Sequence, residues 1–348
     1  MSLSVHIKKT VGDFQLSIDF EHEQGITGLL GASGCGKSMT LKCIAGIMKP
    51  EEGRIVLNGR VLFDSEKRIN LKPQERSVGY LFQNYALFPN MNVEQNILCG
   101  LKKEKDKSVR LKKMEEMLAM MELGTCRKLL PHQLSGGQQQ RCALARILVS
   151  EPELLLLDEP FSALDSYLRE QLQTQIRRIL KGFGKDVLMV SHSRDEVYYL
   201  CSQVAVMNQG RILNYGKTKE VFADPKSKTA AILTGCKNVA DAYKTGAFEV
   251  YVPDWDIHLR TKAPVGDELC GVGLRAHYFH PKARENMFPV TFADEREDPF
   301  ELRLLFRYEN QKQGTPDIWW RMPKDRRPDE IPKELGIAPA NVLLLYPE

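Results

Sequence analysis

Alternating apolar and polar positions open the chain. Leu3 to Lys9 and Phe14 to Phe20 repeat this alternation with a period of two, which is typical of strands that bury one face. We expect these two segments to pair. Residues 54–57 and 60–63 form two further runs, and the Asn58-Gly59 dipeptide between them strongly favours a tight hairpin turn. The pattern therefore predicts antiparallel strands in this part of the chain.

Short apolar runs without alternation follow, and they predict buried strands. They lie at residues 26–30, 78–82, 154–157, 187–190 and 204–207, and a further strand is expected at 211–215. Helices are expected between them at residues 39–47, 92–101, 108–121, 138–149 and 167–180, the second of these capped by Asn92. Strands that alternate with helices predict an α/β fold with a mostly parallel sheet covered on both faces. Residues 88–150 are interpreted as a helical subdomain.

Composition changes near residue 235, and a chain of 348 residues is long enough for two domains. Residues 236–348 hold all three tryptophans and 11 of the 18 prolines. Short alternating runs separated by proline and glycine favour a small β-barrel there. The same region has 16 Lys and Arg against 19 Asp and Glu, so it is not a nucleic-acid-binding arm. We expect domains at 1–235 and 236–348.

Other sequence features indicate a cytoplasmic protein. The chain contains no run of 18 apolar residues, and its first residues lack the pattern of a signal peptide. Its eight cysteines include no Cys-x-x-Cys pair, so we expect reduced thiols and neither a zinc site nor a disulfide framework. Cys35 is interpreted as a bystander rather than a redox switch.

A glycine-rich loop, GASGCGKS at residues 31–38, stands between a predicted strand and a predicted helix. Glycines let the backbone N–H groups turn toward phosphate oxygens, and the N-terminus of the helix adds partial positive charge. The Lys37 ammonium is expected on the β- and γ-phosphates, and the Ser38 hydroxyl on a magnesium ion. A loop that only caps a helix is the alternative. The candidate nucleotide-binding residues are Gly31, Ala32, Ser33, Gly34, Cys35, Gly36, Lys37, Ser38 and Met39.

Two further segments suit the same chemistry. The apolar run 154–157 ends in Asp158 and Glu159; the first carboxylate can hold magnesium and the second can orient or deprotonate water, although an acidic exit turn is an equal alternative. LSGGQ at residues 134–138 is a second glycine-rich helix start. These two phosphate-binding helix starts lie far apart in the sequence. Either the fold of one molecule or the pairing of two molecules must bring both of them to the same nucleotide.

Six motifs in order over residues 1–235 resemble the ATPase subunit of an ATP-binding cassette (ABC) transporter. They are the Walker A motif at 31–38, the Q-loop at Gln83, the LSGGQ signature at 134–138, Walker B at 154–159, the D-loop at 162–165 and the switch histidine at His192. The resemblance implies a P-loop NTPase cassette with an antiparallel β subdomain and a helical subdomain. For residues 236–348 it implies a regulatory domain of the OB or TOBE type.

The resemblance also implies a mechanism. ATP and Mg²⁺ are the expected cofactors, with Glu159 as general base, His192 on the γ-phosphate and Gln83 near the attacking water. The implied magnesium ligands are Ser38, Gln83 and Asp158. In a head-to-tail homodimer the partner copy would add the signature residues Ser135 and Gly137. Gly136, Gln138 and Asp165 of the D-loop are further implied nucleotide-binding residues.

The implied location is the cytoplasmic face of the cell membrane, as a peripheral subunit. Residues 83–92 would form part of the groove for a permease helix, and a periplasmic or extracellular solute-binding protein would be an indirect partner. One departure concerns adenine. The family stacks an aromatic residue where this chain has Val11, and the alternation assigns Phe14, the nearest aromatic, to the core.

The transported solute is less well defined. Residues 53–62 and 79–83 are similar to molybdate-type importer subunits, with sulfate-type subunits close behind, and residues 271–276 resemble part of the barrel domain of such importers. The Ser-Ala-Arg-Asn type of opening of a molybdate-binding barrel is missing, so anion sensing by this region is only a hypothesis. A soluble cassette acting on DNA or ribosomes is the alternative from another class.

Overall fold

The computed structural model describes residues 3–162 and 166–348, and the chain divides into two compact units after Thr218. Composition placed the boundary later, near residue 235. The difference arises because helices α7 (Thr218–Ala223) and α8 (Lys228–Leu233) group with the second unit. The Arg275 guanidinium explains this grouping, since it donates hydrogen bonds to the carbonyls of Phe222 and Thr234.

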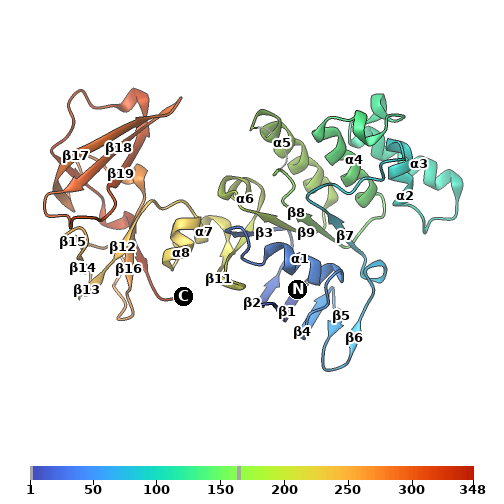
Figure 1. The fold of residues 1–348 in the computed structure, drawn as a ribbon, viewed down its shortest axis with the longest axis horizontal. Coiled ribbons are helices and arrows are strands. Elements are labelled where there is room, and N and C mark those ends of the chain that lie inside the picture. Colours follow the sequence, from blue (N-terminus) through green and yellow to red (C-terminus); the bar gives the residue numbers. More distant parts are fainter. Residues whose placement is uncertain (1–2, 163–165) are drawn as a thin grey trace. The chain divides into compact units, whose positions relative to one another are not determined.

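The first unit begins with an antiparallel sheet (Figure 1), as the alternating pattern predicted. Its strand order is β2 (Phe14–His22), β1 (Leu3–Val11), β4 (Glu52–Leu57), β5 (Arg60–Asp64) and β6 (Ile69–Asn70). Asn58 and Gly59 both have positive φ, 48° and 79°. This is the geometry of the type I′ turn that their sequence favours.

A six-stranded sheet forms the centre of the same unit. Its order is β11 (Arg211–Lys217), β10 (Gln203–Asn208), β3 (Ile26–Gly31), β9 (Asp186–Ser191), β8 (Leu154–Asp158) and β7 (Val78–Leu81). All neighbours run parallel except β10 and β11. Every residue of β8 and β9 is buried, as expected for strands covered on both faces. The predicted α/β fold is confirmed.

Helices follow the strands of this sheet. They are α1 (Lys37–Ala45), α2 (Val93–Cys99), α3 (Lys107–Met120), α4 (Gly136–Leu148), α5 (Ser166–Phe183) and α6 (Arg194–Leu200). Asn92 caps α2 as predicted, by accepting a hydrogen bond from Gln95 N. Figure 1 shows α2, α3 and α4 grouped together, and all three lie within residues 88–150. Within the described ranges, no helix is both long and apolar enough to cross a bilayer.

The second unit contains three antiparallel sheets around one core. Their orders are β12 (Asn238–Asp241), β16 (Gly271–Leu274), β21 (Val342–Leu345); β13 (Tyr243–Gly246), β14 (Glu249–Val252), β15 (Ile257–Arg260); and β19 (Ile318–Pro323), β18 (Glu301–Tyr308), β17 (Met287–Glu297), β20 (Glu334–Gly336). Trp255 and Trp320 belong to the buried apolar cluster that all three sheets share. This β-rich unit is consistent with the predicted TOBE-like domain.

Arg76 fixes the end of α1, the helix that follows the glycine-rich loop. Its guanidinium is 0% exposed and donates to the carbonyls of Cys43 and Ile44, at 2.9 and 2.8 Å, in the last turn of that helix. It also donates to Leu71 O and to Asn70 Oδ1 beside strand β6. One buried side chain therefore connects the helix to the antiparallel sheet. It is a charged donor to two carbonyls of the last helical turn, of which Cys43 O also accepts from Gly46 N.

We expect Arg76→Met to destabilise the first unit by about 3 kcal/mol, because buried carbonyls would lose a charged donor. Urea unfolding followed by far-UV circular dichroism measures this change, since the helices α1 to α6 lie in that unit. Tryptophan fluorescence reports on the second unit, which holds all three tryptophans, and its transition should move less. Arg60→Met, at an exposed position of β5, is the control. Equal midpoints for the two variants would contradict this role for Arg76.

Candidate functional site

The glycine-rich loop leaves β3 and wraps around the side chain of Lys37. The Lys37 ammonium donates to the carbonyls of Gly31 and Ala32, both at 2.8 Å, and the side chain is almost wholly buried. Gly36 has a φ of 103°, and a Cβ added there would lie 2.6 Å from Leu16 Cδ1. Only glycine fits this position without strain. The loop is thus folded around its own cation.

A cavity of about 560 Å³ lies beside this loop. It brings together most of the predicted loop residues with Gln83 and Glu159, which come from distant parts of the chain. The described residues that line it are Val11, Phe14, Ser33, Gly34, Gly36, Lys37, Ser38, Met39, Lys42, Met48, Gln83 and Glu159. The cavity therefore combines an apolar wall with a cationic floor and a carboxylate, which suits a ligand with an aromatic part and an anionic part.

Val11 and Phe14 form part of the apolar wall. They face each other across the β1–β2 pair, and Val11 is 46% exposed. The assignment of Phe14 to the core alone needs correction, because this half-buried ring packs on the core cluster and also lines the cavity. Its place at the start of β2, next to a tight turn, explains why a strict alternation rule misassigned it.

Asp158, at the end of β8, accepts two hydrogen bonds from hydroxyl groups. Ser38 Oγ donates to its Oδ1 at 2.6 Å, and the Tyr80 hydroxyl donates to its Oδ2 at 2.7 Å. Burial, and then the hydrogen bond to Asp158, raise the pKa of Tyr80, so the phenol stays protonated and acts as a donor. Sequence reasoning missed Tyr80; its only signal was its position on a strand predicted to lie in the same sheet.

Glu159 follows with a left-handed backbone, φ 46°, and its N–H donates to Val190 O on β9 at 3.1 Å. Two predicted partners surround its carboxylate. Gln83 Nε2 lies 3.4 Å from Glu159 Oε2 and 3.3 Å from Ser162 Oγ, and His192 Nδ1 lies 3.6 Å from the same carboxylate oxygen. The fold therefore gathers Gln83, Glu159 and His192, and adds Ser162, which sequence analysis had assigned only to a loop motif.

His192 owes its position to the end of β9. Ser191 Oγ donates to the buried carboxylate of Glu196 at 2.5 Å and accepts a hydrogen bond from Ser193 N at 2.9 Å. Burial raises the pKa of Glu196. These contacts hold the backbone on both sides of His192, whose side chain is mostly exposed.

The glycine-rich segment at 134–138 lies apart from this cavity. Ser135 caps α4, and Gln138 returns the contact: Gln138 N donates to Ser135 Oγ at 3.3 Å and Ser135 N donates to Gln138 Oε1 at 2.9 Å. Among the described residues that line the cavity, none comes from this segment. Asp165 lies outside the described residues.

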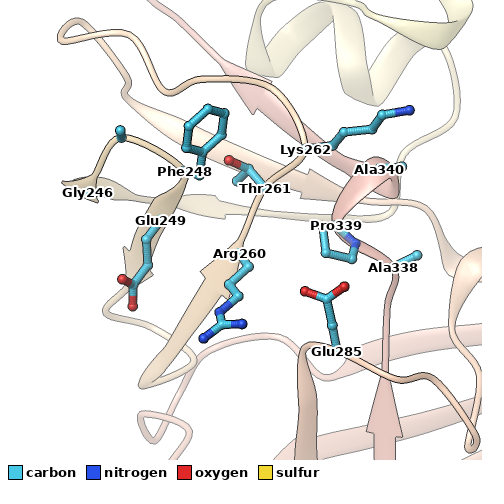
Figure 2. Close-up of a pocket in the computed structure, with 11 residues that line it drawn as sticks. Gly246, Phe248, Glu249, Arg260, Thr261, Lys262, Glu285, Ala338, Pro339 and Ala340 are labelled. Carbon is cyan, nitrogen blue, oxygen red and sulfur yellow. The ribbon is translucent and has the colours of Figure 1, made fainter.

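A second cavity, of about 700 Å³, lies in the second unit (Figure 2). Its lining includes two cations, Arg260 and Lys262, and two carboxylates, Glu249 and Glu285. This balance of charge does not select for an anion. Of the two cavities, only the one beside the glycine-rich loop has the groups needed for phosphate chemistry.

Comparison with known proteins identifies the family. The ABC transporter family model matches residues 15–162. The Fe(3+) ions import ATP-binding protein FbpC of Fusobacterium nucleatum is 37% identical over 268 residues, which cover 74% of this chain and 70% of that protein. The chain belongs to the ABC transporter family.

Other members of the family are similar to this chain at comparable levels. The putrescine transport ATP-binding protein PotG of Escherichia coli (strain K12) is 41% identical over 66% of this chain, and the molybdenum import ATP-binding protein ModC of Aliivibrio fischeri is 38% identical over 64% of it. The chain spans only 59% and 60% of the lengths of these two relatives.

Solved structures of ABC cassettes share the fold of the first unit. The dimeric post-hydrolysis state of the cassette MJ0796 bound to ADP and Pi has a TM-score of 0.53 at 26% identity, covering 63% of this chain and 99% of that one. The cbiO1 protein of Clostridium perfringens has a TM-score of 0.56 at 28% identity, covering 64% and 91%. The ABC cassette fold is confirmed.

In this ABC cassette, an arginine of the signature helix α4 holds the segment that follows Gln83. Tyr85 and Ala86 both have left-handed backbones, φ 59° and 46°. Arg146 Nη2 donates to Tyr85 O at 3.1 Å and Nη1 to Ala86 O at 2.8 Å, while its guanidinium lies 5.1 Å from the ring centroid of Phe88. Two consecutive non-glycine residues of this kind are strained, so we infer that Arg146 maintains their conformation.

We expect Arg146→Lys to loosen this segment, because a single ammonium does not reproduce the two-pronged donation of a guanidinium. A loss of about 1.4 kcal/mol would raise the population of the open segment about tenfold. Limited chymotrypsin digestion at Tyr85 and Phe88, scored by mass spectrometry, measures it. Arg178→Lys, an exposed arginine on α5, is the control. Unchanged cleavage in the Arg146 variant would show that the strained segment does not need this arginine.

Proposed function

We propose that this ABC cassette is the ATP-hydrolysing subunit of an importer. The observation that supports this best is the convergence of Lys37, Ser38, Gln83 and Glu159 on one cavity. Asp158 accepts a hydrogen bond from Ser38, and His192 lies beside Glu159. Each requirement of phosphoryl transfer then has candidate residues. Lys37 would bind the phosphates, Ser38 and Asp158 would hold the metal, and Glu159 would act as the base for water. Family membership alone does not give the chain this activity, because the chain spans less than two thirds of the length of several relatives.

The donors beside the loop fit a magnesium ion. Ser38 Oγ and the Asp158 carboxylate are oxygen donors 2.6 Å apart, and the Gln83 amide lines the same cavity; hard divalent cations prefer oxygen ligands. Magnesium, when bound, supplies positive charge at the phosphate oxygens. In our proposal Lys37 binds the β- and γ-phosphates, Glu159 accepts a proton from the attacking water, and His192 contacts the γ-phosphate.

The proposed active form is a head-to-tail homodimer. Two observations support it: the signature segment at 135–138 lies apart from the cavity of its own chain, and the similar cassette MJ0796 has been solved as a dimer. Ser135, Gly136, Gly137 and Gln138 of one copy would complete the nucleotide site of the other. Since the contacts of the partner's signature residues with the γ-phosphate would exist only in the closed dimer, hydrolysis would favour opening.

The proposed partners are membrane permease subunits at the cytoplasmic face, with a solute-binding protein acting indirectly. The names of the relatives support an import role, because those cited include import proteins for iron and molybdenum and a putrescine transport protein. Molybdate is our candidate solute from residues 53–62 and 79–83. Relatives with other solutes match equally well, so sulfate, a polyamine or iron are alternatives. The second unit is proposed to be regulatory.

Glu159→Gln should leave ATP affinity within about twofold while lowering turnover by about a hundredfold to ten-thousandfold, the range for loss of a general base. It should also accumulate as an ATP-bound dimer on gel filtration. Glu153→Gln changes a partly exposed carboxylate next to β8 that accepts a hydrogen bond from Asn58 Nδ2; it is the control and should hydrolyse ATP normally. Substantial turnover in the Glu159 variant would show that another group takes the proton.

Lys37→Ala should weaken ATP binding instead, by about 2 kcal/mol or thirtyfold, because a charge-assisted contact with the phosphates is lost. Equilibrium binding of ATP in a filter assay measures this loss. Lys8→Ala changes an exposed lysine on β1 and should bind as the unmodified chain does. If the Lys37 variant kept full affinity, the phosphate-loop assignment would be wrong.

A further inference from the structure

Tyr80 has a role that the ABC motifs do not assign. It lies on β7, three residues before Gln83, and its backbone pairs with Leu156 in the neighbouring strand β8. Its hydroxyl donates to Asp158 Oδ2 at 2.7 Å, while Ser38 Oγ occupies the other oxygen, Oδ1, at 2.6 Å. One carboxylate is therefore held from two sides by groups on separate elements.

We propose that Tyr80 is a positioning residue that orients the Asp158 carboxylate for the magnesium ion. This inference rests on the proposed function. A carboxylate at the end of a strand can rotate about its last torsion, which is broad. The Tyr80 hydroxyl binds one of its two oxygens, and this leaves the other directed at Ser38, the second oxygen donor of the metal site.

The surroundings of Tyr80 make it suited to this task. Its ring lies 4.4 Å from that of Phe82, centroid to centroid, and packs on the core cluster of the first unit. Asp158 itself is 7% exposed, so water competes weakly for its oxygens. Partners that orient metal ligands in this way typically change metal affinity by 10- to 100-fold when they are removed.

A merely structural role would have a different signature. Removing the hydroxyl while keeping the ring lowers only the stability of the first unit if the group is no more than a buried hydrogen bond. Such a loss would not alter how nucleotide binding depends on magnesium. The magnesium dependence therefore separates the positioning role from a structural one.

The test compares Tyr80→Phe with its parent in a Glu159→Gln background, which suppresses turnover. Binding of a fluorescent ATP analogue to the full chain is measured in EDTA and then over a magnesium titration, and binding of Mn²⁺ is followed by electron paramagnetic resonance. We expect the half-saturating metal concentration to rise about tenfold, while affinity for the analogue in EDTA changes less than twofold.

Tyr251→Phe is a matched control. The Tyr251 hydroxyl also donates to a carboxylate, Asp256 Oδ1 at 2.8 Å, but on the exposed surface of the second unit. This variant should keep the metal dependence of the parent. An unchanged metal midpoint in Tyr80→Phe, or an equal loss of affinity in EDTA and in magnesium, would overturn the inference. If the parent itself bound no nucleotide, the proposed function would fail first, so the two failures are distinguishable.

Discussion

The candidate site depends on one property of a parallel sheet: the carboxyl ends of its strands lie at the same edge. Four adjacent strands, β3, β9, β8 and β7, run parallel in the first unit. The glycine-rich loop follows β3, and His192 follows β9. Asp158 ends β8 with Glu159 directly after it, and Gln83 follows β7. The parallel arrangement alone thus brings segments separated by more than 150 residues along the chain to the same edge of the sheet.

Residues with a left-handed backbone adjust the path of the chain beside the side chains that this topology brings together. Glu159 turns directly after the buried strand β8, at φ 46°, and its N–H bonds back to β9. Tyr85 and Ala86 turn the chain after Gln83 in the same way, held by Arg146 of the signature helix. Such positions cost energy, and both stand next to residues of the proposed chemistry. The signature helix and the Gln83 segment are consequently joined by one arginine.

Much of this arrangement could be predicted from the sequence, since local patterns determine it. Period-two alternation identified β1 and β2, continuous apolar runs identified β8 and β9, and the motif spacing identified the residues around the cavity. Tyr80, Ser162, Arg76 and Arg146 were missed because their roles depend on contacts between distant segments. In the second unit the alternating runs did not locate β12, β13, β17, β19 and β20. Helices α7 and α8 were not separated from the first unit, because Arg275 binds them through backbone carbonyls that have no sequence signature.

The conformation of the signature segment, residues 135–138, affects how two copies would form the proposed dimer. Ser135 and Gln138 cap each other, so the N–H of Gln138 is already bonded within its own helix. The first N–H groups of a helix have no partner inside it, and here they belong to Gly136 and Gly137, which have no side chain to block an approaching anion. In the proposed dimer, a phosphate presented by a second copy would approach the N–H of Gly136, which is partly exposed, without first breaking the cap, whereas Gly137 is buried beside Leu172. The segment is organised for binding before a partner arrives, so dimer closure need not include the cost of ordering it.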